Sequence, residues 1–197
     1  MSPAHITSFA RRLQVVLWLF FLLTTGIAAP LAADAVTLNE LVDNPRLNAK
    51  KYASYFGDFV YEFNNAIQPP DVFLERERGD CDDYAVLADF VLKKHGLQTR
   101  LIHVRLAGRI AHAVCYVGES SGYLDYNNRK VFFTLAKSGP DLRDIASKVA
   151  DSLEVNWTTA SEFSYSYETR RKTMISTVSK TGEAIAPGAP NSPFHVQ

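Results

Sequence analysis

The chain has 197 residues, with 21 basic and 21 acidic side chains, so its formal net charge is zero. This balance provides no basic field that would attract nucleic acid or an anionic membrane surface, and we expect neither as a partner. A hydrophobic content of 47% and a charged content of 21% are those of a globular domain that can bury a core.

The first residues have the pattern of an export signal. Arg11 and Arg12 precede an apolar run over 13–27, and Ala33-Asp34-Ala35 fits a signal-peptidase cleavage site. The apolar run is short for a membrane span. We therefore expect residues 1–35 to be a cleaved signal peptide. The protein would then be exported, periplasmic or secreted, with no stable membrane span after cleavage. The alternative is an uncleaved anchor.

Two helices are predicted next. Aromatic side chains recur at intervals of three and four residues over 48–66, which predicts a helix with a buried aromatic face that ends before the prolines of 68–70. A second helix is predicted over 80–95, where the first aspartate is a good N-cap, Asp83 is its capping partner and Gly96 follows the last turn. This second helix is apolar over most of its surface, so we expect it to be buried in the middle of the domain.

Strand patterns separated by turns follow. Strands are predicted over 99–106, 110–117, 123–126 and 130–134, then a helix over 141–153, then strands over 154–158 and 162–167. Residues 181–197 are rich in Gly, Ala and Pro without periodicity, which predicts a disordered tail after a single domain at 36–180. The order of elements predicts an α+β fold with helices packed on one side of an antiparallel sheet.

Cys81 occupies the first position of the predicted buried helix. Free backbone N–H groups and the positive end of the helix dipole lie there, and both stabilise a thiolate. The backbone N–H of Cys81 also points towards the place where an oxyanion would form. These features suit a nucleophile. The alternative is a structural disulfide with Cys115, the second of the two cysteines.

His112 lies in the predicted strand over 110–117, where a histidine taken alone is most readily explained as a structural residue. Strand alternation places His112 and Cys115 on opposite faces. If His112 faces the start of the cysteine helix, Cys115 faces away from it. A Cys81–Cys115 disulfide and a Cys81–His112 pair are then mutually exclusive.

Asp125 lies in the next predicted strand, where its carboxylate is placed to orient the imidazole of His112 and to stabilise its charged form. Taken alone, an aspartate there could equally face solvent at the end of a hairpin. The turn before this strand leaves the pairing register open. Asn127 or Asn128 could therefore take the place of Asp125.

Three segments resemble the transglutaminase-like superfamily, in the order found there. Gly79-Asp80-Cys81-Asp82-Asp83-Tyr84-Ala85 resembles the G-D-C-x-[DE]-[YF]-A start of the nucleophile helix, and Gly96-Leu97-Gln98-Thr99-Arg100 resembles the G-[IL]-x-x-R segment after it. His112-Ala113-Val114 resembles the H-A-[WV] strand, and Asp125 lies in a further strand. The resemblance covers about residues 68–128, and its first segment is specific.

The resemblance implies a papain-like α+β fold and a catalytic triad of Cys81, His112 and Asp125. The implied activity is that of a cysteine peptidase or amidase that cleaves amide bonds through a thioester. Its substrate would be a protein, a peptide or a cell-wall peptide, and the small domain favours hydrolysis over cross-linking. The alternative is a non-catalytic binding or assembly module with the same fold.

The chain departs from the family pattern at three points, one of which is that Tyr126 and Asn127 follow Asp125 where a proline or threonine is often found. Many members have tryptophan where this chain has Val114, and the oxyanion-hole side chain is not identified, with Gln68 and Tyr84 the nearest candidates. No cofactor or metal is predicted, because no His, Cys, Asp or Glu residues have metal-site spacing. Asp82 and the aspartates on either side of it would suit calcium, but acidic residues are favoured at a helix start in any case.

Overall fold

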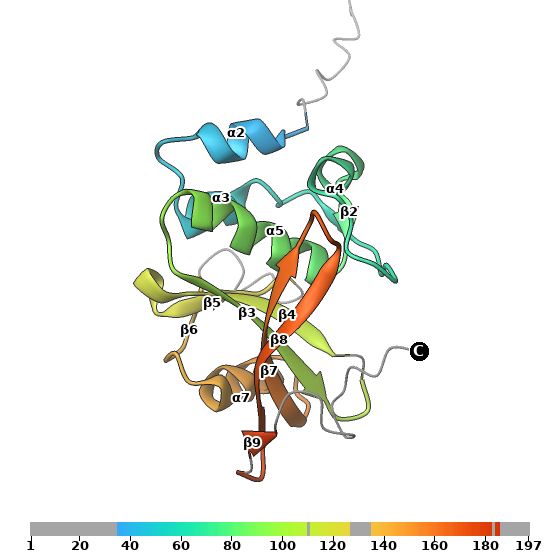
Figure 1. Ribbon diagram of the computed structural model, residues 1–197, viewed down its shortest axis with the longest axis vertical. Helices are drawn as coiled ribbons and strands as arrows, with labels where there is room; N and C mark the ends of the chain where they lie inside the picture. Colours follow the sequence, from blue (N-terminus) through green and yellow to red (C-terminus); the bar gives the residue numbers. More distant parts are fainter. Residues whose placement is uncertain (1–34, 110, 127–134, 183, 186–197) are drawn as a thin grey trace, which may run out of the picture. The chain divides into compact units, whose positions relative to one another are not determined.

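The computed structural model describes residues 35–109, 111–126, 135–182 and 184–185. These residues form an α+β fold in which helix α5 (Cys81–Lys94) packs on a seven-stranded sheet (Figure 1). The predicted cysteine-bearing helix on an antiparallel sheet is thereby confirmed. The predicted signal peptide, except for its last residue, and the predicted strand at 130–134 lie outside the described residues. None of the helices in the described ranges has the length and apolar character of a membrane span.

The sheet has the strand order β6-β5-β4-β3-β7-β8-β9, and every neighbouring pair is antiparallel. Its strands are β3 (Thr99–Leu106), β4 (His112–Val117), β5 (Gly122–Leu124), β6 (Ala136–Lys137), β7 (Trp157–Ser166), β8 (Arg171–Ser179) and β9 (Ala184–Ile185). A short 3-10 turn, η2 (Gly118–Ser120), joins β4 to β5. The strands expected at 154–158 and 162–167 are one continuous strand, β7. Strand pairing also continues to Ile185, within the range predicted to be a tail.

Hydrophobic clusters cover both faces of the sheet. In β3, Leu101 packs into the cluster that contains α5, whereas Ile102 and Val104 pack into a second cluster with helix α7 (Leu142–Ser152). The expectation that the helices lie on one side of the sheet is therefore wrong, because α7 covers the face opposite α5 (Figure 1). The β7–β8 hairpin extends beside α5, where the rings of Phe90 and Tyr167 lie 5.5 Å apart.

The predicted signals at both ends of α5 are observed. Asp80 is the N-cap and forms a capping box with Asp83, so that two backbone N–H groups of the first turn are bonded by side chains. At the other end, His95 is the C-cap and Gly96 follows with a φ of 76°. Only glycine adopts this left-handed conformation without steric cost, which accounts for the end of the helix there.

The N-terminal part of the domain is less helical than predicted. Its elements are α2 (Leu38–Asp43), α3 (Ala49–Ser54), β1 (Val60–Tyr61), α4 (Pro70–Arg76) and β2 (Arg78–Gly79), with β1 parallel to β2. The helix predicted over 48–66 is therefore wrong beyond Ser54. The backbone N–H of Phe56 bonds to the carbonyl of Ala53, three residues back, which tightens the last turn. The prolines start α4, with proline at the first helical position, where its missing N–H costs nothing.

The aromatic spacing nevertheless identified core residues. Tyr52, Phe56 and Phe59 are at most 3% exposed, whereas Phe63 is 57% exposed. The rings of Phe56 and Phe59 pack at 4.9 Å, and both approach Phe73 of α4. A loop can satisfy this packing as well as a helix can, so the spacing alone did not distinguish them.

Candidate active site

Cys81 is the first residue of α5 and is 8% exposed. The helix start is held from outside the helix as well as from within it. A carboxylate oxygen of Asp80 accepts the N–H of Asp82 at 3.0 Å, and its other oxygen accepts the N–H of Asn64 at 3.0 Å. Asp83 accepts the N–H of Asp80 at 3.0 Å. The backbone on both sides of Cys81 is therefore fixed by side-chain hydrogen bonds.

Asp83 joins the helix start to the segment before α4. Its side chain is buried, with 1% exposed, and it accepts the backbone N–H of Gln68 at 2.7 Å and the Nε2 amide of Gln68 at 3.0 Å. A buried carboxylate is stable only while its hydrogen-bond donors stay in place, because no water replaces them there. The acidic residues around Cys81 thus have a structural function in the capping network. Within the described ranges, no group of three or more His, Cys, Asp or Glu side chains is arranged to hold a metal ion.

Gly79 precedes this network and must be glycine for reasons of space. A Cβ atom at this position would lie 2.6 Å from Oδ2 of Asp83 and 2.6 Å from the ring of Phe73. Atoms at such a distance overlap, so any larger residue would displace the carboxylate that caps α5. The first glycine of the Gly-Asp-Cys segment is therefore explained by close packing.

His112 and Asp125 form a buried pair. His112 is the first residue of β4, and Asp125 directly follows β5, which pairs with β4 through Cys115 and Leu124. This pairing brings Nε2 of His112 to 2.7 Å from Oδ1 of Asp125. The two residues are 2% and 0% exposed, so the alternative of a solvent-facing Asp125 is wrong. Asn127 and Asn128 lie outside the described residues.

The environment of His112 favours its charged form. Burial alone lowers the pKa of the imidazole, but the negative charge of Asp125, the hydrogen bond to it and the hydrogen bond to Cys81 outweigh burial and raise the pKa of His112 to about 10. Because Nε2 is bonded to Asp125, Nδ1 is the ring nitrogen left for Cys81. The structure therefore brings the three predicted residues together, with His112 between the other two.

Cys81 and His112 open onto a cavity of about 510 Å³. His103, Arg109 and Leu153 also line it, so the end of the β3–β4 hairpin and the end of α7 contribute to its wall. A second cavity of about 530 Å³ adjoins it. The two cavities share four lining residues, which are Asn64, Asn65, Asp80 and Asp82. A peptide bound across Cys81 can therefore extend from the first cavity into the second.

Cys115 is not a partner for Cys81. Both thiols are free, and Cys115 is fully buried. Burial and the nearby charge of Asp89 hold the pKa of the Cys115 thiol well above its usual range. Asp89 lies roughly 12 Å along α5 from Cys81, at 1.5 Å per residue. The expectation that Cys115 faces away from α5 is wrong, because Cys115 packs in the α5 cluster. The two cysteines are instead separated along the helix.

Neither predicted oxyanion candidate lines the cavity beside Cys81. The amide of Gln68 donates to the carbonyl of Arg78 at 2.8 Å and to Asp83 at 3.0 Å, so both of its N–H groups are used. The ring of Tyr84 stacks on that of Tyr126 with centroids 3.4 Å apart. Both side chains therefore have structural functions.

His103 is a cavity residue that sequence reasoning missed. It pairs with Ala113 in the neighbouring strand, directly after the Val104–His112 pair, and it lines the same cavity as Cys81. Burial lowers the pKa of His103 to about 4, against a smaller opposing effect of the charge of Asp82. The imidazole is therefore neutral at neutral pH. The sequence could have identified His103 only through the pairing of β3 with β4, because that pairing places His103 opposite Ala113, the residue after His112.

The family comparison agrees with the predicted resemblance. A family model described as the transglutaminase-like superfamily matches residues 34–128. Among solved structures, calcium-bound LapG from Legionella pneumophila matches at 23% identity with a TM-score of 0.43, over 61% of this chain and 70% of LapG. The EGTA-treated LapG structure matches at 19% identity with a TM-score of 0.43, over 68% of this chain and 77% of LapG. No curated protein sequence matches this chain.

Proposed function

We propose that the protein is a cysteine hydrolase that cleaves amide bonds in peptides or proteins, because residues 34–128 match the family model of the transglutaminase-like superfamily. The observation that supports this most strongly is the buried His112–Asp125 pair, at 2.7 Å, beside the helix-start Cys81. Cys81 is the nucleophile, His112 the acid and base, and Asp125 the residue that orients His112.

The reaction follows from the protonation states of these residues. With a pKa of about 10, His112 is an imidazolium at neutral pH, and its proton on Nδ1 stabilises a thiolate on Cys81. The thiolate attacks the amide carbonyl carbon and forms a C–S bond. The C–N bond then breaks, and the departing amine takes the proton from Nδ1 of His112. The product is a thioester between the substrate acyl group and Cys81.

Water completes the cycle. The now neutral His112 removes a proton from a water molecule, whose oxygen attacks the thioester carbonyl. The C–S bond breaks, the carboxylic acid leaves and the thiolate–imidazolium pair is restored. The backbone N–H of Cys81 lies in the first turn of α5, where N–H groups have no partner within the helix, and it is the proposed oxyanion donor. Cys81 lines the cavity of about 510 Å³, which has room for a water molecule beside the thioester.

A comparison of variants on a mixed peptide pool tests this function. Wild type, Cys81→Ala and Cys115→Ala are incubated with peptides and cell-wall peptide fragments in water enriched in oxygen-18. Wild type and Cys115→Ala should release new carboxyl termini that carry the heavy isotope, and Cys81→Ala should release none. Activity that persists in Cys81→Ala would exclude Cys81 as the nucleophile. Complete inactivity of wild type across the pool would favour the non-catalytic binding or assembly module.

We further propose that the protein works outside the cytoplasm, as a periplasmic or secreted protein. The support is the sequence pattern of Arg11 and Arg12, the apolar run over 13–27 and the cleavage pattern that ends at Ala35. The mass of the protein isolated from its host should correspond to a chain that starts after residue 35. A mass that includes the apolar run would show an uncleaved anchor instead.

A further inference from the structure

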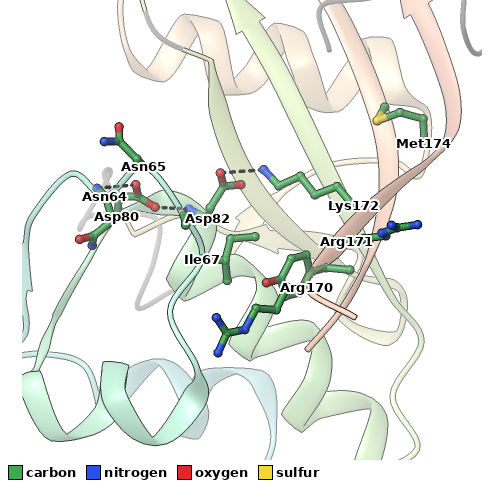
Figure 2. Close-up of a pocket in the computed structure, with 11 residues that line it drawn as sticks. Asn64, Asn65, Ile67, Asp80, Asp82, Arg170, Arg171, Lys172 and Met174 are labelled. Carbon is green, nitrogen blue, oxygen red and sulfur yellow. Dashed lines mark hydrogen bonds and ion pairs between the residues drawn. The ribbon is translucent and has the colours of Figure 1, made fainter. Parts of the chain in front are cut away.

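The cavity beyond Cys81 has a wall formed by the turn of the β7–β8 hairpin. This second cavity is lined on one side by Asn65, Ile67 and neighbouring residues, and on the other by Arg170, Lys172 and Met174 from the hairpin (Figure 2). It shares Asn64, Asn65, Asp80 and Asp82 with the cavity of Cys81. A peptide cleaved at Cys81 would therefore place one of its side chains near the hairpin.

The positively charged side chains that line this second cavity outnumber its carboxylates. Nζ of Lys172 lies 2.8 Å from Oδ2 of Asp82, so these two charges offset each other. The carboxylate of Asp80 accepts two backbone N–H groups, from Asn64 and Asp82. Among the described residues, neither Arg170 nor Arg171 of the cavity lining forms an ion pair, so the cavity carries cationic charge that its own carboxylates do not neutralise.

Arg170 is placed by the hairpin turn. It has a φ of 53°, lies immediately before β8 and is exposed. In Figure 2 the side chains of Arg170 and Arg171 leave the hairpin in different directions, with Arg170 on the side of Ile67. The two arginines are adjacent in sequence, yet only Arg170 points towards the segment that forms the opposite wall.

We propose that this cavity is a subsite for an acidic side chain of the substrate, whose carboxylate is bound by Arg170. The inference rests on the proposed function, because it assumes a peptide that crosses Cys81. A guanidinium binds a carboxylate through two parallel hydrogen bonds, which gives direction as well as charge. Ile67 and Met174 offer apolar surface to the methylene groups of such a side chain, which favours glutamate over aspartate.

Peptide selection on an inactive protein tests the subsite without requiring turnover. Cys81→Ala protein is immobilised and exposed to a random octapeptide pool with blocked ends, and the retained peptides are sequenced by mass spectrometry. Peptides with glutamate or aspartate should be enriched on the order of tenfold over matched glutamine or asparagine peptides at low ionic strength. The enrichment should disappear in Cys81→Ala/Arg170→Gln. It should persist in Cys81→Ala/Arg46→Gln, which removes an exposed arginine that lines neither cavity.

Charge reversal gives a positive result that loss of folding cannot imitate. Cys81→Ala/Arg170→Glu should retain lysine-containing peptides in place of acidic ones. Acidic enrichment that survives Arg170→Gln, or no acidic enrichment at all, would overturn the subsite. Enrichment of basic peptides on Cys81→Ala would overturn it too, and would assign recognition to Asp80 and Asp82. Because binding is measured on a protein without its nucleophile, none of these results depends on whether the wild type is an active hydrolase.

Discussion

Nε2 of His112 lies 2.7 Å from Oδ1 of Asp125, and both side chains are buried. This hydrogen bond fixes the plane of the imidazole and leaves Nδ1 for Cys81. It also places a carboxylate charge where it can hold a proton on the ring at neutral pH. The orientation of His112 therefore depends on Asp125, and its protonation state depends more on Asp125 than on Cys81.

Replacement of Asp125 should impair turnover more than it impairs folding. In Asp125→Ala the imidazole loses both its orientation and the charge that supports its protonated form, and we expect kcat to fall by about a hundredfold or more. Asp125→Asn keeps a hydrogen-bond acceptor without the charge, so it should recover part of the activity. The pKa of His112, followed by NMR titration of its ring protons, should fall in both variants.

Thermal unfolding of the same variants is the control, because Asp125 is fully buried and its loss also costs stability. Full turnover in Asp125→Ala, together with inactivity in Asn127→Ala or Asn128→Ala, would show that an asparagine orients His112 instead.

The His112–Asp125 pair should make stability decrease in alkaline solution. The pKa of His112 is raised from 6.5 to about 10, so the folded protein keeps a proton that the unfolded chain releases in this range. The stabilisation is complete below pH 6.5 and is lost as the pH rises through about 10. His112→Gln should remove this dependence from urea unfolding curves. An identical decline in wild type and His112→Gln would mean that His112 does not hold the proton.

His103 should make the stability of the folded protein decrease in acidic solution. Its pKa is lowered from 6.5 to about 4 by burial, so the unfolded chain takes up a proton that the folded protein does not. The free energy of unfolding should therefore fall as the pH decreases from 6.5 to about 4. His103→Gln should reduce that fall in urea unfolding experiments. A steeper acid dependence in the variant would contradict the burial of a neutral imidazole.

Gly79→Ala should destabilise the protein and disturb the start of α5. The added Cβ would lie 2.6 Å from Oδ2 of Asp83, so either this carboxylate or the backbone must move. We expect a loss of about 2 kcal/mol or more in the free energy of unfolding, typical of a broken buried network. Gly118→Ala is the matched control, because its Cβ would lie no closer than 3.4 Å to any neighbour. Equal stability of the two variants would show that the capping network tolerates displacement.

The features that were predicted most accurately are those that depend on residues close to one another in the sequence. Helix α5 has an N-cap aspartate, a capping partner at Asp83 and Gly96 at its end, and each signal acts within a few residues. Strand β3 was likewise predicted with its observed bounds, because alternation and the flanking turn agree over 99–106. Cys81 could be placed at a helix start for the same reason.

Features that depend on tertiary pairing were missed. The aromatic spacing of 48–66 reported burial correctly but not conformation, since Phe56 and Phe59 pack against α4 from a loop. His103 could not be placed beside Cys81 until the register of β3 and β4 was known. The same holds for the position of Cys115 under α5, because strand alternation does not reveal which face a helix will cover.

Alkylation by iodoacetamide at about pH 6 distinguishes an activated Cys81 thiolate from an ordinary thiol, because only a thiolate reacts appreciably there. The rate at Cys81 is measured by peptide mass spectrometry in wild type and in His112→Gln, and it is compared with a cysteine in an unstructured peptide. We predict that Cys81 reacts about tenfold faster than the peptide cysteine, or more, and that His112→Gln removes this advantage. Reaction of wild-type Cys81 no faster than the peptide cysteine would contradict an activated nucleophile at the start of α5.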